Sequence, residues 1–185
     1  DSRSSIEEIA ERLEAEGSGK NWAIAGNSLS ENGARICRKN MPEDDICSPE
    51  VILPRLRRMA EGEAEAELPS CNIWIRRGFR AIYPDIESAE DHWLVCHLMV
   101  NQPDEGLILH ESLFATYSLT GKNTEKNRSN GSFLRSRRRL LSSVKFWING
   151  ENSQDEEICI GWGCEGVVWL TGSTVRKRFH SRLLN

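Results

Sequence analysis

The chain has 185 residues, a net charge of −4 and a hydrophobic fraction of 38%. This length is enough for one domain with its own core, without help from disulfides. No stretch approaches the ~20 consecutive apolar residues of a transmembrane helix. A membrane-spanning segment is therefore excluded, and we expect no membrane partner.

The N-terminal segment predicts an amphipathic helix over residues 4–16. Ser4 or Ser5 can cap it, and apolar residues recur at helical spacing: Ile6, Ile9, Ala10 and Leu13. The segment 17–19, Gly-Ser-Gly, ends the pattern. We expect residues 1–19 to form an acidic helical arm beside a single α+β domain over residues 20–185.

Residues 20–68 are expected to be the helical part of that domain. After a short apolar segment at 22–24, Ser28 or Ser30 can begin a helix through residues 29–39. A second helix is expected from Ser48-Pro49, because a Ser cap followed by Pro at the first helical position is a strong start signal.

Residues 71–185 are expected to be the β-rich part. Strands are predicted at 71–75, 79–83, 107–109, 113–119, 158–162 and 167–170. Residues 93–100 fit either a helix that begins near residue 88 or a buried strand, since periodicity does not separate the two. Residues 140–148 alternate in part and end at Asn149-Gly150, which predicts a hairpin. The fold class is therefore α+β, with N-terminal helices followed by a mainly antiparallel β-sheet.

The cysteines fit reduced structural thiols better than a metal site. They are Cys37, Cys47, Cys71, Cys96, Cys159 and Cys164. Cys159 and Cys164 have the spacing of one half of a zinc site, but structural zinc needs a second closely spaced pair. We therefore expect no metal and no cofactor.

A cysteine nucleophile is the alternative interpretation of Cys164. The segment 161–166, Gly-Trp-Gly-Cys-Glu-Gly, is similar to the glycine-flanked nucleophile of chymotrypsin-like viral cysteine proteases. Trp162 and Glu165 stand where that family has glycines, and an acidic neighbour opposes thiolate formation. A base would have to come from His92, His97 or His110. The chain has no phosphate-binding or other catalytic motif, so we expect no enzyme.

Charge is segregated along the chain. Acidic residues dominate 1–16 and 43–67, whereas basic residues dominate 120–147 and the C-terminal end. Clustered cations neutralise phosphates, and neighbouring aromatic rings stack on bases. The predicted nucleic-acid-binding residues are Arg128, Arg135, Arg137, Arg138, Arg139, Lys145, Arg176, Lys177 and Arg178. A solvated protein face and a nuclear-import signal remain alternative interpretations of the same clusters.

One family resemblance agrees with the charge pattern. Asn21-Trp22, the segment 37–39 (Cys-Arg-Lys), Cys47, Trp74 and Cys96 occur in an order similar to that of the DNA-binding region of foamy-virus Tas-type transactivators. The resemblance covers residues 20–185 in order and spacing. The cysteine intervals are longer here, and residues 120–139 would be an insertion. The resemblance implies a viral protein that binds promoter DNA directly and activates transcription.

The sequence thus predicts a nucleic-acid-binding regulatory protein. The partner is DNA or RNA, and the location is the nucleus, or the host nucleus if the protein is viral, and otherwise the cytoplasm. The first alternative is a protein-interaction adaptor that does not bind nucleic acid. Its partner would be a second copy of this chain, in a homo-oligomer, or a host protein. The second is a cysteine hydrolase that uses Cys164.

Overall fold

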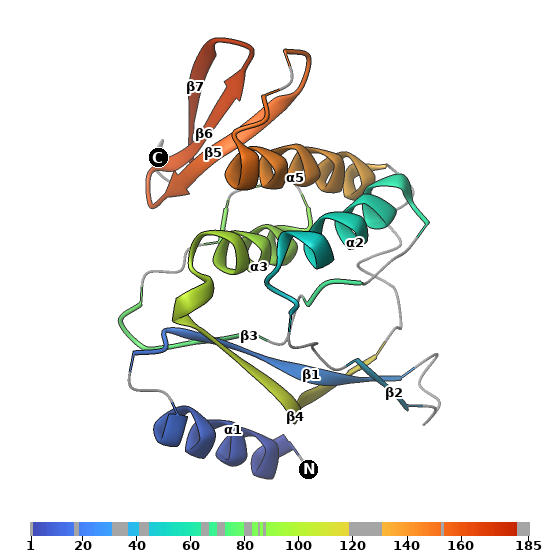
Figure 1. Ribbon diagram of the computed structural model, residues 1–185, viewed down its shortest axis with the longest axis vertical. Coiled ribbons are helices and arrows are strands. Elements are labelled where there is room, and N and C mark those ends of the chain that lie inside the picture. Colours follow the sequence, from blue (N-terminus) through green and yellow to red (C-terminus); the bar gives the residue numbers. More distant parts are fainter. Residues whose placement is uncertain are drawn as a thin grey trace.

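The computed structural model describes residues 2–16, 19–30, 37–40, 45–63, 67–69, 73–79, 83, 84, 86, 88–118, 131–152 and 154–180. In chain order the elements are α1 (Ser2–Glu16), β1 (Trp22–Ser30), β2 (Cys37–Asn40), α2 (Pro49–Glu61), β3 (Ile73–Ile75), α3 (Glu90–Asn101), η1 (Pro103–Glu105), β4 (Gly106–Ser118), α5 (Ser132–Asn149), β5 (Glu157–Gly163), β6 (Gly166–Thr171) and β7 (Thr174–Phe179). They stack as α1, the N-terminal sheet (β1–β4), α2 with α3, α5, and the C-terminal sheet (β5–β7) (Figure 1). The expected α+β class is confirmed.

The N-terminal sheet is built around β1. One edge of β1 pairs with β4 in parallel, from Trp22 opposite Gly106 to Ser30 opposite Ser118. The other edge is shared by two short antiparallel strands, β3 beside residues 22–24 and β2 beside residues 27–30. The other strand pairings that the structure describes are antiparallel as well.

Alternation along β1 gives this sheet two buried faces. Trp22 and Ile24 point into the main core with α2 and α3, whereas Ala23 and Ala25 point toward α1. Ile9 of α1 is completely buried against the two alanines. Residues 2–16, expected as an arm, are therefore a packed outer layer of the fold.

Two helices form the central layer. The start of α2 at Ser48-Pro49 is confirmed, with Ser48 at the N-cap and Pro49 as the first helical residue. The question left open at residues 93–100 is settled as a helix, α3. Most of α3 is buried on every side, which explains why its sequence lacks a single apolar stripe.

Two expected elements were wrong. Residues 29–39 do not form one helix, because β1 continues to Ser30 and β2 begins at Cys37. Residues 140–148 are the second half of α5 rather than a strand. Leu140 and Val144 are one helical turn apart and fully buried. Gly150 is not a hairpin residue: at φ +70° it ends the helix, and its N–H donates to the carbonyl of Phe146.

The C-terminal sheet lies against α5. The predicted strands at 158–162 and 167–170 are confirmed as β5 and β6, and a third strand, β7, follows Gly172. The Trp147 indole N–H donates to the Cys159 carbonyl, and the Cys159 N–H donates to the Ser143 hydroxyl. These bonds fix β5 along the helix.

A tryptophan cluster joins the central layer to the C-terminal sheet. The ring of Trp93 in α3 makes edge-to-face contacts with Trp147, Trp162 and Trp169 at centroid distances of 5.8–6.4 Å. Its indole N–H donates to the hydroxyl of Ser136 in α5. No helix among the described residues is long and apolar enough to span a bilayer.

Candidate nucleic-acid interface

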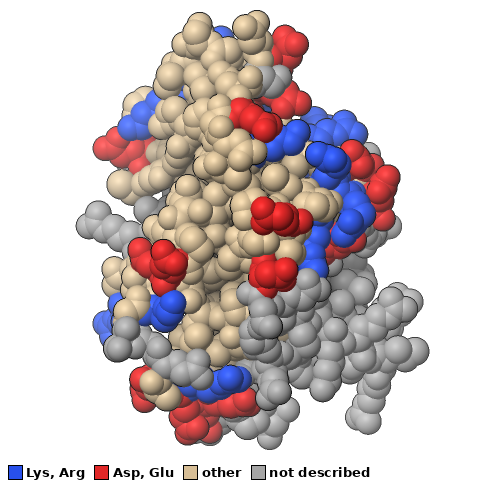
Figure 2. All heavy atoms as spheres, in the orientation of Figure 1, with Lys and Arg blue, Asp and Glu red and all other residues tan. Residues whose placement is uncertain are grey.

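The first half of α5 exposes a stripe of arginines. Arg135, Arg138 and Arg139 are all exposed, and their spacing of three and four residues places them on one helix face. The Arg138 Nε donates to the carbonyl of Ala60 near the C-terminal end of α2. Figure 2 shows basic side chains gathered on the right of the view, over the adjoining ends of α2 and α5, with acidic side chains beside them.

Arg137 is the exception in this cluster. Its side chain is only 7% exposed, and its guanidinium lies 4.4 Å from the centre of the Phe133 ring. The helix turns this residue toward α3, because residue 137 lies on the opposite side of α5 from residues 135 and 139. Arg137 therefore contributes to packing, and we leave it out of the interface.

Arg139 links α5 to the C-terminal sheet. Its guanidinium is 3.3 Å from the carboxylate of Glu157 in β5 and 5.8 Å from the ring centre of Trp169 in β6. Both members of the ion pair are partly exposed. An ion pair in that setting contributes about 0–1 kcal/mol, so a phosphate can replace the Glu157 carboxylate at low cost.

Strand β7 carries the second cluster on both of its faces. Arg176 is opposite Trp169, and Arg178 is opposite the buried Val167. Directly opposed residues of antiparallel strands share a face, so both arginines project on the side of the sheet that α5 covers. Lys177 projects on the other side, where it binds the carboxylate of Glu165 and lies 4.9 Å from the Phe179 ring centre.

The two basic clusters meet at Trp169. Arg139 approaches its ring from α5, and Arg176 lies beside it on the neighbouring strand. All five arginines of this group are exposed: Arg135, Arg138, Arg139, Arg176 and Arg178. We call this group the arginine surface. Arg139 and Arg176, from segments about forty residues apart in the sequence, thus both lie beside Trp169.

The other predicted residues that the structure describes, Lys145 and Lys177, are not part of this surface. Lys145 is half-buried and lines a hollow of about 310 Å³ together with Ser142, Glu151, Asn152, Glu156 and Ile158. Arg128 lies outside the described residues. Lys177 belongs to the opposite face of β7.

Sequence reasoning missed the contribution of α2. Its exposed Arg57 and Arg58 lie on the helix that packs against α5. Arg58 is held by Glu67 through two hydrogen bonds from its Nε and one from its terminal nitrogen. The run of basic residues in α2 was visible in the sequence, but its position beside α5 depends on a long-range packing contact.

The thiols have the character of core residues. Cys47, Cys96, Cys159 and Cys164 are free, and Cys164 is exposed. Burial raises the pKa of Cys47 to about 11 and the pKa of Cys96 and Cys159 to about 12. Those three thiols stay protonated at neutral pH, which opposes both metal binding and nucleophilic attack.

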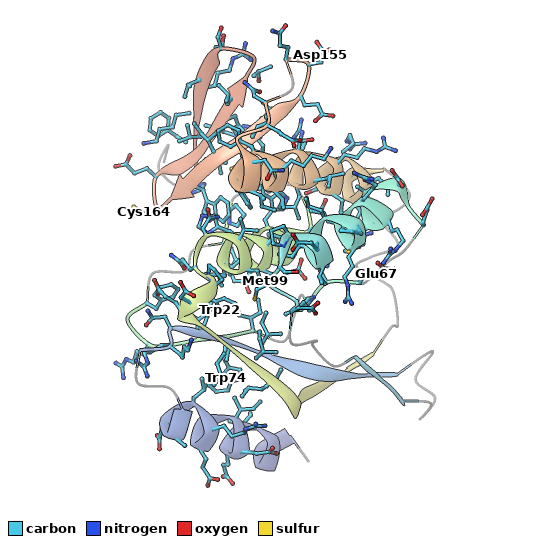
Figure 3. The ribbon with its side chains drawn as sticks, viewed as in Figure 1. Trp22, Glu67, Trp74, Met99, Asp155 and Cys164 are labelled. Atoms are coloured by element: carbon cyan, nitrogen blue, oxygen red, sulfur yellow. The ribbon has the colours of Figure 1, made fainter. Side chains whose placement is uncertain are left out.

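Cys164 stands apart at the turn between β5 and β6. Figure 3 shows it at the outer tip of that hairpin. Within the described part of the chain, no cluster of metal-binding side chains is found. His92 is buried near Phe133, and the ring of His97 contacts that of Trp162 at a tilted angle, with centroids 4.5 Å apart.

Comparison with known proteins adds no relative. No family model, no curated protein and no solved structure matches this chain.

Proposed function

We propose that this protein binds nucleic acid through the arginine surface, by contacts to phosphates rather than to base edges. The observation that carries the proposal is the meeting of Arg139 and Arg176 at Trp169. Each guanidinium can donate two parallel N–H bonds to the oxygens of a phosphate, and a cluster of them can neutralise several phosphates.

The position of α5 favours phosphate contact over base readout. A recognition helix must expose a whole face to enter the major groove. Here α5 is packed between α2 and β5, and its exposed arginines occupy only a stripe in its first half. The arginines can therefore follow a backbone, whereas the helix cannot insert into a groove.

The regulatory role is a separate part of the proposal. It rests on the similarity of residues 20–185 to Tas-type transactivators, which implies a viral activator that acts in the nucleus. Nothing in the fold carries that role independently. The test is a reporter gene driven by a candidate promoter. Its expression is compared between the unmodified protein and a variant with alanine in place of the arginines of the arginine surface.

The binding proposal is tested by fluorescence anisotropy on labelled duplex and single-stranded oligonucleotides across a salt series. The first variant combines Arg135→Ala, Arg138→Ala and Arg139→Ala, and the second combines Arg176→Ala and Arg178→Ala. We expect each to weaken binding equally for all sequences. Each should also reduce the steepness of the salt dependence by about one unit for every phosphate that the variant no longer neutralises.

A matched control removes two arginines elsewhere. Arg76→Ala with Arg77→Ala changes the net charge as much as the β7 variant does, but both residues lie beside β3 at the other end of the fold. This control should bind like the unmodified chain. Undetectable binding at low salt, or an equal reduction of affinity in the control, would overturn the proposal.

A further inference from the structure

The outer edge of β7 is open. The strand order is β5-β6-β7, and no other strand that the structure describes pairs with β7. All six residues, Thr174–Phe179, are exposed. An exposed edge strand presents unpaired N–H and C=O groups on which another strand can form.

The hairpin register identifies those groups. Thr171 and Thr174 flank the two-residue loop Gly172-Ser173, in which Gly172 has φ +56°. The pair that closes such a loop is hydrogen-bonded, and hydrogen-bonded pairs then alternate along the strands. The hydrogen bond from the His180 N–H to the Glu165 carbonyl agrees with this alternation, since residue 180 also faces β6. Backbone groups of the even-numbered residues thus face β6, and those of Val175, Lys177 and Phe179 face the open edge.

The side chains disfavour a second copy of this chain as the occupant. Antiparallel pairing of two β7 strands around Lys177 would set Lys177 against its own copy and Arg176 against the other chain's Arg178. Like charges placed directly opposite one another destabilise a strand pair. The same three cations attract a strand of opposite charge.

An acid is already bound at this strand within the molecule. Glu165, in the turn that precedes β6, forms an exposed ion pair with Lys177. The two apolar residues of β7, Val175 and Phe179, are 59% and 53% exposed. They flank the three cations at positions 176–178 on either side.

We propose that β7 binds an extended acidic segment of a partner protein, which adds to the C-terminal sheet as a fourth strand. Residues opposite Arg176, Lys177 and Arg178 would be acidic, and those opposite Val175 and Phe179 would be apolar. The five residues of the bound segment that face residues 175–179 should therefore be apolar-acidic-acidic-acidic-apolar. This pattern is symmetric, so it fits parallel and antiparallel pairing equally. This site uses the strand edge, whereas the proposed nucleic-acid site uses α5 as well.

The direct test uses the full chain and labelled peptides in fluorescence anisotropy. The probe has a Val-Glu-Asp-Glu-Val core between Gly-Ser flanks. One control replaces the three acids with lysine, and another rearranges the same residues to Glu-Val-Asp-Val-Glu. We expect the probe to bind about tenfold more tightly than either control, since each opposed charge pair contributes a fraction of a decade in affinity.

Two variants separate the strand edge from general charge attraction. Lys177→Pro removes an edge-facing N–H at a position where proline fits an edge strand, and it should abolish binding of the probe. Arg176→Glu with Arg178→Glu should reverse the preference in favour of the lysine peptide, so the test survives if the proline variant fails to fold. Arg76→Glu with Arg77→Glu is the matched control and should change nothing.

Several results would overturn the inference. They are equal binding of the acidic and lysine peptides, equal binding of the rearranged peptide, no binding, or a dimer in light scattering that Lys177→Pro abolishes. The α5 variant with alanine at residues 135, 138 and 139 should keep the peptide while it releases the oligonucleotide. Loss of oligonucleotide binding alone would leave this site intact, and loss of peptide binding alone would leave the nucleic-acid proposal intact.

Discussion

The two sheets of this protein differ in how much of each is covered. The N-terminal sheet is enclosed by α1 on one face and by α2 with α3 on the other, and the central strand β1 is paired along both edges. Among the described elements, only α5 covers a face of the C-terminal sheet, and no described strand pairs with the outer edge of β7. Figure 1 shows the first sheet between helices and the second at the end of the stack.

The sequences of β1 in the N-terminal sheet and β7 in the C-terminal sheet reflect that difference. Residues 22–26 of β1 are apolar throughout and buried, because both faces of the strand are packed. Residues 175–179 place three consecutive basic residues between two apolar ones, and they are exposed on both faces. Figure 3 makes the first case visible, with Trp22 and Trp74 on opposite faces of the N-terminal sheet. The N-terminal sheet is enclosed in the fold, and both proposed binding sites include residues of the C-terminal sheet.

The largest expected effect comes from a substitution in the tryptophan cluster, which joins the central layer to the C-terminal sheet. Trp93→Ala removes a completely buried ring from the tryptophan cluster and leaves Ser136 without its indole donor. We expect a decrease of about 3–5 kcal/mol in the free energy of unfolding, measured by urea denaturation. Tyr83→Ala, at a 54% exposed ring, is the control and should change stability by less than about 0.5 kcal/mol. A similar decrease in both variants would contradict the role of the cluster.

The second effect comes from weakening the contact between α1 and the face of the N-terminal sheet that it covers. Ile9→Ala should cost about 2–3 kcal/mol, the low end for such a truncation, since α1 can settle toward Ala23 and Ala25. Hydrogen exchange should show faster opening of α1 than of α5. Ile6→Ala on the same helix starts from a side chain 42% exposed and should cost far less. Equal destabilisation by the two variants would mean that α1 does not depend on its contact with the sheet.

The mildest effect near neutral pH concerns the central layer. Burial lowers the pKa of His92 below its usual 6.5; Asp91 raises it and Arg137 lowers it. Burial also lowers the pKa of His97. As the pH falls below about 6.5, the unfolded chain takes up protons that the folded chain does not, so stability decreases. His92→Phe should flatten the dependence of the unfolding free energy on pH between 7 and 5. An unchanged slope in that variant would assign the protons to other groups.

Local signals in the sequence predicted part of this structure well. Ser48-Pro49 located the start of α2, and the short apolar runs at 158–162 and 167–170 located β5 and β6. In both cases the residues that set the backbone geometry are adjacent in the chain. The class of the fold followed from the same kind of signal.

The errors arose where one signal serves two structures. Asn149-Gly150 is typical of a hairpin, but glycine also ends helices, and only the spacing of Leu140 and Val144 favours the helix. The candidate site was limited in a similar way. The sequence located both arginine clusters, but the helical turn that buries Arg137 and the register that sets Arg176 beside Trp169 depend on the fold.

The parallel pairing of β1 with β4 has a consequence for the order of folding. It joins residues 22–30 to residues 106–118, so the loop between the two strands contains β2, β3, α2 and α3. Closing so long a loop is slow, whereas β5, β6 and β7 follow one another through short turns. During synthesis the N-terminal sheet must wait for β4 to emerge. Until then β1 exposes an apolar segment, and we expect chaperones to bind the nascent chain there.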